Sequence, residues 1–157
     1  MRFLVLSTFS TVLLDIVAWL FFHLAVSYWV TRRPAEKFSC LNGWYRPRSF
    51  EKETRLYRIL RVHDWKSNLP DAAPWFAGPP KSKLPGRHKV ALSLFLTETC
   101  RGELAHWLTF LCGPLFFLWN KPWVGAVMMF YAGLINFPCI LVQRYNRLRL
   151  WRILNLR

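Results

Sequence analysis

Three long apolar blocks constrain this chain more than any other feature, because segments of that length are typical of lipid-embedded helices. They cover residues 3–30, 104–119 and 122–142. An α-helix rises ~1.5 Å per residue, so about 20 apolar residues cross a hydrocarbon core of ~30 Å. The pattern predicts an all-α integral membrane protein with about three transmembrane helices.

The second block is short for a transmembrane helix. A helix is expected to begin within residues 90–96 and to continue into this block. The Gly-Pro pair at 113–114 should kink it, which leaves both a full crossing and a re-entrant segment open. An Asn-Lys-Pro turn at 120–122 should then lead into the third block.

The distribution of charge predicts how the chain is oriented. Lys and Arg number 22 against 8 Asp and Glu, and 15 of those 22 lie in the polar segment 31–103. One lies between the last two blocks and five follow Val142. Because positive charge gathers in cytoplasmic loops, we expect a multi-pass plasma-membrane protein with its N-terminus outside and its C-terminus in the cytoplasm. The same pattern makes nucleic acid a poor candidate partner.

The length of 157 residues predicts a single membrane domain over residues 1–157. A signal peptide cleaved near residues 25–27 is the alternative for the first block. The apolar stretch is longer than the usual 7–15 residues of such a peptide, which favours an uncleaved anchor. Asp15 and His23, about two helical turns apart, could both face the interior of the bundle.

The polar segment contains two recognisable patterns. Residues 50–65 place apolar side chains at helical spacing among charges, which predicts a basic amphipathic helix on the cytoplasmic membrane surface. Residues 69–85 hold five prolines and should form a loop or extended connector.

The four cysteines, at positions 40, 100, 112 and 139, form no CxxC pair. Their spacing predicts neither a disulfide framework nor a zinc site. Cys112 and Cys139 fall in apolar blocks, where a thiol behaves as a small hydrophobic side chain. We therefore expect structural cysteines.

The segment 97–107 is the first candidate site. On a helix Glu103 and His106 are neighbours, so the carboxylate could orient or charge the imidazole. Ionisable groups where a helix enters the membrane are expensive and often serve in relays or catalysis. An interfacial ion pair, or a histidine capping a neighbouring helix, is the alternative.

The last apolar block carries the second candidate site. Asn136, Gln143 and either Asn146 or Arg147 recur at helical spacing, and residues 143–147 offer amide and guanidinium donors at the membrane surface. Ordinary membrane anchoring or a helix–helix hydrogen bond are the alternatives. A third set around His63, at residues 61–66, fits a solvated or headgroup-binding face better than a catalytic site.

These same segments resemble a known family. Residues 98–107, ETCRGELAHW, resemble the ET-x-R-x-EL-x-HW stretch of the glycosyl-4,4'-diaponeurosporenoate acyltransferases. Asn136, Pro138 and the QRYNR run at 143–147 resemble the N-x-P…QRYNRPRL ending of that family, and residues 61–66 are similar to its weaker R-x-x-x-WK element. Leu148 stands where the family pattern has proline.

The resemblance implies a bacterial membrane enzyme of carotenoid biosynthesis. Such enzymes esterify a fatty acyl group onto the primary hydroxyl of the glucose in a glycosylated C30 carotenoid acid, as in staphyloxanthin. No permanently bound cofactor and no metal are expected, and acyl-CoA or another acyl donor would be the co-substrate. The expected partners are the lipid bilayer, the glycosylated carotenoid and the donor. A non-catalytic scaffold of pigment or lipid enzymes and a small lipid methyltransferase remain as alternatives.

Within that family setting we expect His106 to act as general base, with Glu103 orienting its ring. Asn136 or Gln143 would stabilise the oxyanion, and Arg144 and Arg147 would hold the phosphates of the donor. No Ser or Cys is placed to form an acyl-enzyme, so direct transfer is expected. The remaining candidate substrate- or donor-binding residues are Glu98, Arg101, His63, Tyr145 and Asn146.

Overall fold

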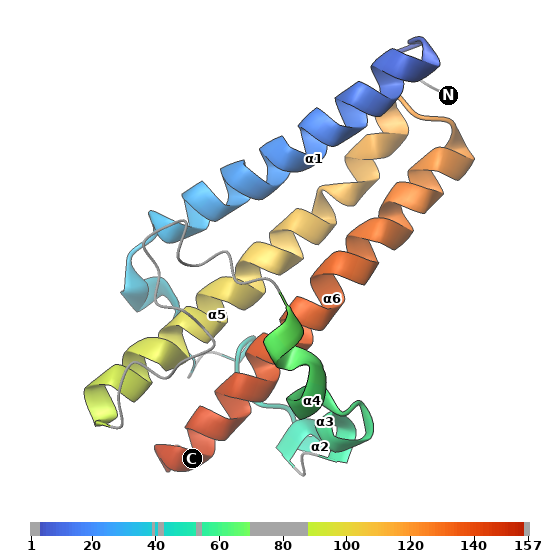
Figure 1. Ribbon diagram of the computed structural model, residues 1–157. Helices are drawn as coiled ribbons and strands as arrows, with labels where there is room; N and C mark the ends of the chain where they lie inside the picture. The colour runs from blue at the N-terminus through green and yellow to red at the C-terminus, as the bar shows by residue number, and fades with distance from the viewer. Residues whose placement is uncertain (1–3, 39, 41–42, 53–54, 70–87, 156–157) are drawn as a thin grey trace.

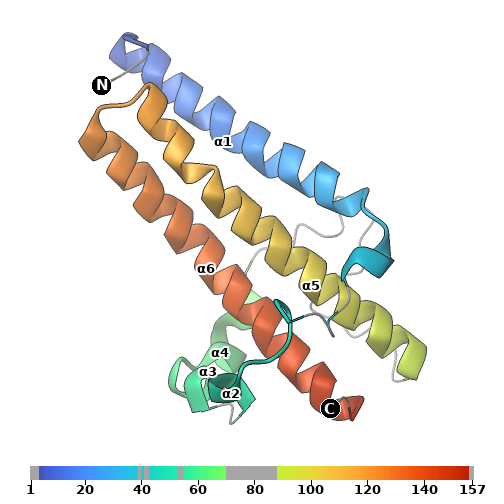
Figure 2. The same ribbon diagram turned by 180° about the vertical axis from the view of Figure 1, so that it is seen from behind.

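Three long helices form the body of the protein. The computed structural model describes residues 4–38, 40, 43–52, 55–69 and 88–155, and it is all-helical there. Helices α1 (Thr8–Thr31), α5 (Lys89–Leu111) and α6 (Pro122–Ile153) lie side by side (Figure 1). Helix α5 runs opposite to its two neighbours, so the N-terminus and the α5–α6 connection share one end of the bundle (Figures 1 and 2).

Two of the three predicted spans are helices long and apolar enough to cross a membrane. Among the described residues these are α1 and α6. The third span, over 104–119, was expected as the continuation of a helix that begins within residues 90–96. The structure bears this out as far as Leu111, where α5 ends, and the 3-10 helix η4 (Gly113–Leu118) follows. Gly113 and Pro114 therefore end the α-helix instead of only kinking it.

The surface of α1 indicates membrane association. Many of its large apolar side chains are more than half exposed, including Phe9, Val12, Leu13, Ile16, Val17, Leu20, Phe21 and Leu24. Phe130 and Leu134 continue this exposed apolar surface on α6. Soluble monomers rarely expose apolar patches of this extent. In lipid these apolar side chains are not exposed to water, so the surface carries no hydrophobic penalty.

Polar hydrogen bonds close the end of the bundle where α1 begins. The Asp15 carboxylate accepts from the Trp119 indole N–H and from the Asn120 amide, each at 2.7 Å. Asp15 therefore faces the bundle interior, as predicted. The His23 ring lies edge-on to Trp19, with the ring centroids 5.0 Å apart.

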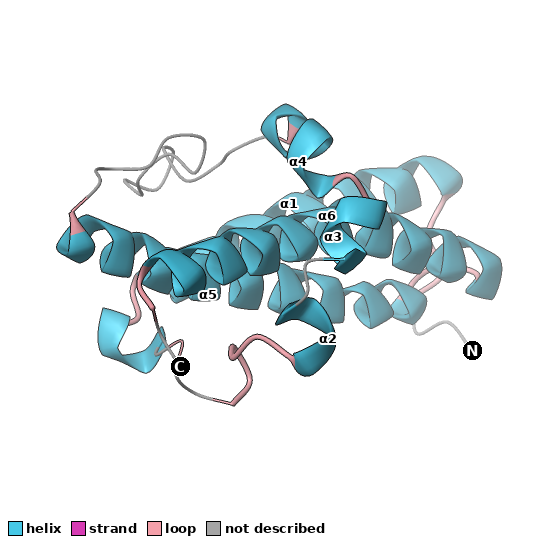
Figure 3. Cartoon of the chain, turned by 90° about the horizontal axis from the view of Figure 1, so that it is seen from below, coloured by secondary structure: helices cyan, strands magenta, loops and turns pink. Residues whose placement is uncertain are grey.

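The predicted amphipathic helix over residues 50–65 was wrong as a single element. The chain forms α2 (Ser49–Lys52), α3 (Arg55–Ile59) and α4 (Val62–Trp65), followed by the 3-10 turn η2 (Lys66–Asn68). Arg61, with a φ of 49°, breaks the helix in the left-handed region. All three short helices lie beside α6 (Figure 3).

Burial explains the break in this segment. Tyr57 and Val62 are almost fully buried and pack with Val142 and Leu148 of α6. A straight helix would carry these two side chains on different faces, because five residues turn it by about 140°. Residues 70–85 of the predicted connector lie outside the described residues.

Cys40 and Cys100 form a disulfide, which corrects the prediction that the cysteines indicate none. The bond joins the segment after the 3-10 turn η1 (Ala35–Phe38) to α5 across 60 positions of sequence. Both cysteines are buried in an apolar cluster with Phe38, Leu96 and Leu150. The pairing depends on the folding of the polar segment back onto α5, which cysteine spacing does not reveal.

Candidate functional site

Two carboxylates and two guanidinium groups form a buried ion network, made of Glu51, Glu103, Arg144 and Arg147. Arg144 binds Glu51 through two hydrogen bonds of 2.6 Å and reaches Glu103 at 2.9 Å. Arg147 binds the other oxygen of Glu103. The two positive and two negative charges balance, so the network is neutral. It joins α2, α5 and α6 at one place.

The network is almost completely desolvated. Arg147 and Glu103 are each 1% exposed and Glu51 is 3% exposed. The remaining donors of Arg147 bind the Tyr45 carbonyl at 3.0 Å and the backbone and hydroxyl oxygens of Thr99 at 3.2 and 3.3 Å. Buried charge is tolerated when it is paired and hydrogen-bonded in this way.

Glu51 stays ionised inside the protein. Burial by itself would raise the pKa of its carboxyl group, but hydrogen bonds from Arg144, the Arg48 backbone N–H and the Tyr57 hydroxyl lower that pKa to about 2. Burial and the nearby Glu51 carboxylate raise the pKa of Tyr57. Tyr57 therefore donates its proton to Glu51 in a hydrogen bond of 2.7 Å.

Sequence reasoning missed Glu51, Tyr57 and Tyr45 as members of this site, whereas helical spacing does put Thr99 on the same face as Glu103. Glu51 was placed on an exposed amphipathic helix, where a carboxylate needs no explanation. A signal was nevertheless present. Two arginines on the face shared with Asn136 and Gln143 require nearby anions if that face is buried. The sequence does not say which of the eight acidic residues supply them.

His106 and Asn136 form the second part of the site. His106 Nδ1 lies 3.0 Å from Asn136 Oδ1, across the α5–α6 interface. The Asn136 amide nitrogen donates to the Ala132 carbonyl at 2.9 Å, which directs its oxygen towards the histidine. Nδ1 must then carry the proton and donate it, so the basic lone pair of the neutral ring belongs to Nε2.

The orienting partner of His106 thus differs from the expected one. Both Glu103 oxygens bind arginines, and Asn136 holds Nδ1 of the imidazole. Gln143 lies between the two groups on the same face of α6, two helical turns from Asn136 and one from Arg147. It is 3% exposed, and its side-chain oxygen has no hydrogen-bond donor among the described residues. A buried amide oxygen of this kind can accept from a substrate hydroxyl.

Glu98 and Arg101 lie away from the arginines of the ion network. They pair with each other at 2.7 Å, and Arg101 also donates to the Arg33 carbonyl at 3.0 Å. The Arg101 guanidinium lies over the Phe38 ring, 5.0 Å from its centroid. These contacts fasten the polar segment to α5.

Asn146, Tyr145 and His63 lie on the outer side of α6. The Asn146 side-chain oxygen accepts from Lys66 at 3.4 Å. The Tyr145 ring packs against Tyr57, with the centroids 5.6 Å apart. His63 is exposed and lies 3.5 Å from Asp64. No group of three His, Cys, Asp or Glu side chains in the described part of the chain could hold a metal ion.

Comparison with known proteins gives a consistent result. Residues 41–156 match the family model described as glycosyl-4,4'-diaponeurosporenoate acyltransferase. Curated relatives with that name come from Staphylococcus haemolyticus (strain JCSC1435) and Staphylococcus aureus (strain MRSA252). They are each 29% identical over 142 and 145 residues, covering 88% of this chain and 82% and 84% of theirs. No solved structure matches the chain.

The matched residues 41–156 include both parts of the site just described, and they make up most of the chain. The relatives cover nearly all of the helical bundle as well. This chain belongs to the glycosyl-4,4'-diaponeurosporenoate acyltransferase family and is an acyltransferase of carotenoid biosynthesis.

Proposed function

We propose that the protein esterifies a fatty acyl group onto a sugar hydroxyl of a glycosylated carotenoid acid in the membrane. The observation that carries this proposal is the hydrogen bond between His106 and Asn136, in a chain that belongs to this family. It gives the site a histidine with a fixed tautomer and a basic Nε2. Direct acyl transfer to a hydroxyl needs such a general base.

In this mechanism His106 Nε2 removes the hydroxyl proton while the sugar oxygen attacks the acyl carbonyl carbon. The C–O ester bond forms and the bond from the acyl carbon to its donor breaks. With a thioester donor, the proton passes from the imidazolium to the departing thiolate. Asn136 holds the ring in place throughout, and Gln143 accepts a hydrogen bond from the sugar.

We assign the buried ion network a positioning role instead of donor binding. The guanidinium groups of Arg144 and Arg147 are engaged by Glu51, Glu103 and backbone oxygens. A phosphate would have to displace these carboxylates from a desolvated site. The network instead fixes α6 against α5, so that Asn136 stays opposite His106 and the two halves of the acceptor site keep their register.

Pigment analysis tests the proposed function. We expect cells that make the glycosylated C30 carotenoid acid to convert it into the acylated glycoside when they express this protein. Mass spectrometry should show the added mass of one fatty acyl group. Cells with an empty vector should accumulate the unacylated glycoside. An unchanged pigment in cells that contain the protein at normal abundance would rule the proposed acceptor out.

The proposed topology has three crossings, with α5 and η4 as the second, the N-terminus outside and the C-terminus in the cytoplasm. Its support is the excess of Lys and Arg in the polar segment and after α6. This topology places the Cys40–Cys100 pair on the cytoplasmic side. Cytosolic reductants keep thiols reduced, whereas disulfides persist outside. The redox state of the pair in cells therefore reports the side of the membrane.

We expect acid-quenched cells to yield Cys40 and Cys100 as free thiols that are alkylated before any oxidation, because the cytosol reduces them. Mass spectrometry of peptides from the quenched cells measures this state. A C-terminal fusion to green fluorescent protein should fluoresce, and a fusion to alkaline phosphatase at the same position should be inactive. A linked Cys40–Cys100 peptide together with an active phosphatase would reverse the orientation.

A further inference from the structure

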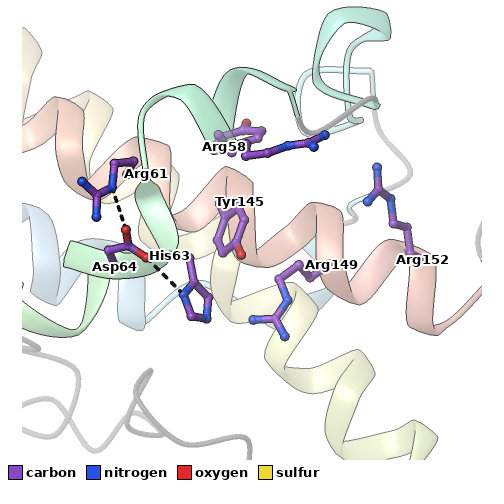
Figure 4. Close-up of a pocket in the computed structure, with 8 residues that line it drawn as sticks. Arg58, Arg61, His63, Asp64, Tyr145, Arg149 and Arg152 are labelled. Atoms are coloured by element: carbon purple, nitrogen blue, oxygen red, sulfur yellow. Dashed lines mark hydrogen bonds and ion pairs between the residues drawn. The ribbon is translucent and has the colours of Figure 1, made fainter.

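A pocket of about 530 Å³ opens between the short helices and the end of α6, and none of the four charged residues of the buried ion network lines it (Figure 4). Its walls come from α3, the residues around α4, and the last turns of α6. The lining residues are strongly basic: Arg58, Arg61, Arg149 and Arg152, with His63, Asp64, Tyr57 and Tyr145. None of them was needed for the proposed acyl-transfer step.

The charge of this pocket is only partly compensated. Among the described lining residues Asp64 is the one carboxylate, and it binds Arg61 at 2.8 Å and lies 3.5 Å from His63 on one side of the pocket. That hydrogen bond from Arg61 lowers the pKa of the Asp64 carboxyl, so Asp64 is ionised near neutral pH. The Asp64 carboxylate thus compensates Arg61 and leaves Arg58 and Arg149 for other partners.

Arg58 and Arg149 carry the free part of this charge. The structure gives neither of them a carboxylate partner within the described residues, and Arg149 lies over the Tyr145 ring at 5.8 Å. Figure 4 shows Arg58, Arg149 and Arg152 around Tyr145, on the opposite side from the Arg61–Asp64 pair. Burial lowers the pKa of Lys66, and the charge of the neighbouring Arg149 adds to this effect. Clustered guanidinium groups are the usual binding groups for phosphate.

We propose that this pocket binds the phosphate groups of a coenzyme A thioester, the acyl donor of the reaction. The inference rests on the proposed function, because it supplies the donor that the transfer requires. The guanidinium groups of Arg58 and Arg149, which have no carboxylate partner among the described residues, fit the several phosphates of the 3'-phospho-ADP part of coenzyme A. With Arg144 and Arg147 occupied by carboxylates, these exposed arginines provide the phosphate contacts that the buried pair does not.

Distance along α6 favours a thioester over a phospholipid donor. Asn136, beside His106, and Arg149, in the pocket, are thirteen residues apart on one helix, which is about 20 Å at the rise of an α-helix. In a phospholipid, only a few bonds separate the phosphate from the ester carbonyl, so one molecule cannot reach both places. The long pantetheine arm of coenzyme A carries a thioester far from its phosphates and can bridge them.

The test is equilibrium binding of coenzyme A to the full-length protein in nanodiscs of phosphatidylcholine, without carotenoid. We expect saturable binding that 3',5'-ADP competes for. Arg58→Gln and Arg149→Gln should each weaken it roughly tenfold or more, since each removes charge-assisted hydrogen bonds to phosphate. Arg55→Gln is the matched control, one turn from Arg58 on α3 and outside the pocket, and should bind like the wild type.

Nanodiscs that contain phosphatidylglycerol test whether the pocket binds the phosphate of a lipid headgroup instead of coenzyme A. If the anionic lipid blocks coenzyme A, and the same two variants abolish lipid enrichment around the protein, the pocket is a headgroup site and the proposal is overturned. Equal binding by wild type and both variants also overturns it. Because binding is measured without turnover, pocket-dependent binding in a protein that leaves the pigment unacylated would refute only the proposed function.

Discussion

Glu103→Gln should destabilise the folded protein by ~3–5 kcal/mol, because it leaves a buried arginine without its counter-ion. Arg147 is 1% exposed, and Glu103 supplies the carboxylate that it binds. Glutamine keeps the size of the side chain but removes the charge, so the cost is electrostatic and not a cavity. Reversible unfolding of the detergent-solubilised protein measures the change.

Two controls separate this effect from a general loss of charge. Asp64→Asn breaks an exposed, solvent-screened pair with Arg61 and should lower the stability far less than Glu103→Gln does. The double variant Glu103→Leu with Arg147→Met removes both charges and should recover most of the stability lost in Glu103→Gln, since apolar replacement of a buried pair is often neutral. If Glu103→Gln lowers the free energy of unfolding no more than Asp64→Asn does, burial of the ion network does not increase its contribution to stability.

His106→Ala should lower kcat for acyl transfer by ~10²–10⁴-fold, the usual contribution of a general base. The variant should fold normally, because His106 is only partly buried and its loss leaves one amide oxygen of Asn136 to be satisfied. Asn136→Leu should reduce kcat by a smaller factor, since the imidazole remains but loses its fixed tautomer. Rates with purified enzyme, glycosylated carotenoid and thioester measure both.

The pH dependence of the acyl-transfer rate tests whether His106 itself is the general base. The wild-type rate should fall at acidic pH as His106 becomes protonated, and the residual rate of His106→Ala should lack this limb. His88→Ala is the matched control, because His88 is an exposed histidine just before α5 whose side chain makes no capping hydrogen bond. An acidic limb that persists in His106→Ala would assign the base to another residue.

Hydropathy alone was sufficient for the helical membrane architecture but not for the details of the middle span. The predicted spans 3–30 and 122–142 correspond to α1 and α6, because runs of apolar side chains have one stable arrangement in lipid, a helix with its backbone hydrogen bonds satisfied internally. The helix leading into the segment 104–119 was expected to begin within residues 90–96, and α5 begins just before that range, at Lys89. What hydropathy did not give is where this α-helix ends, at Leu111.

The polar segment shows why periodicity was not enough. Residues 50–65 have the spacing of one amphipathic helix, yet the chain breaks at Arg61 so that Tyr57 and Val62 are both buried against α6. The Cys40–Cys100 bond has the same origin. Contacts between segments far apart in sequence decide both features, and no local pattern records them.

The sequence by itself determined the helical class, two helices long and apolar enough to cross a membrane and, through its motifs, the family and the residues that gather at the α5–α6 interface. Spacing along one helix is a local property, so His106, Asn136, Gln143 and Arg147 could be singled out from it. Only the tertiary structure decided the partners. In the folded protein Glu103 pairs with Arg144 and Arg147, and His106 forms a hydrogen bond with Asn136. Glu51, from the polar segment, completes the network. The physical reason is that a buried charge takes the nearest opposite charge that packing brings to it, whatever their separation in the chain.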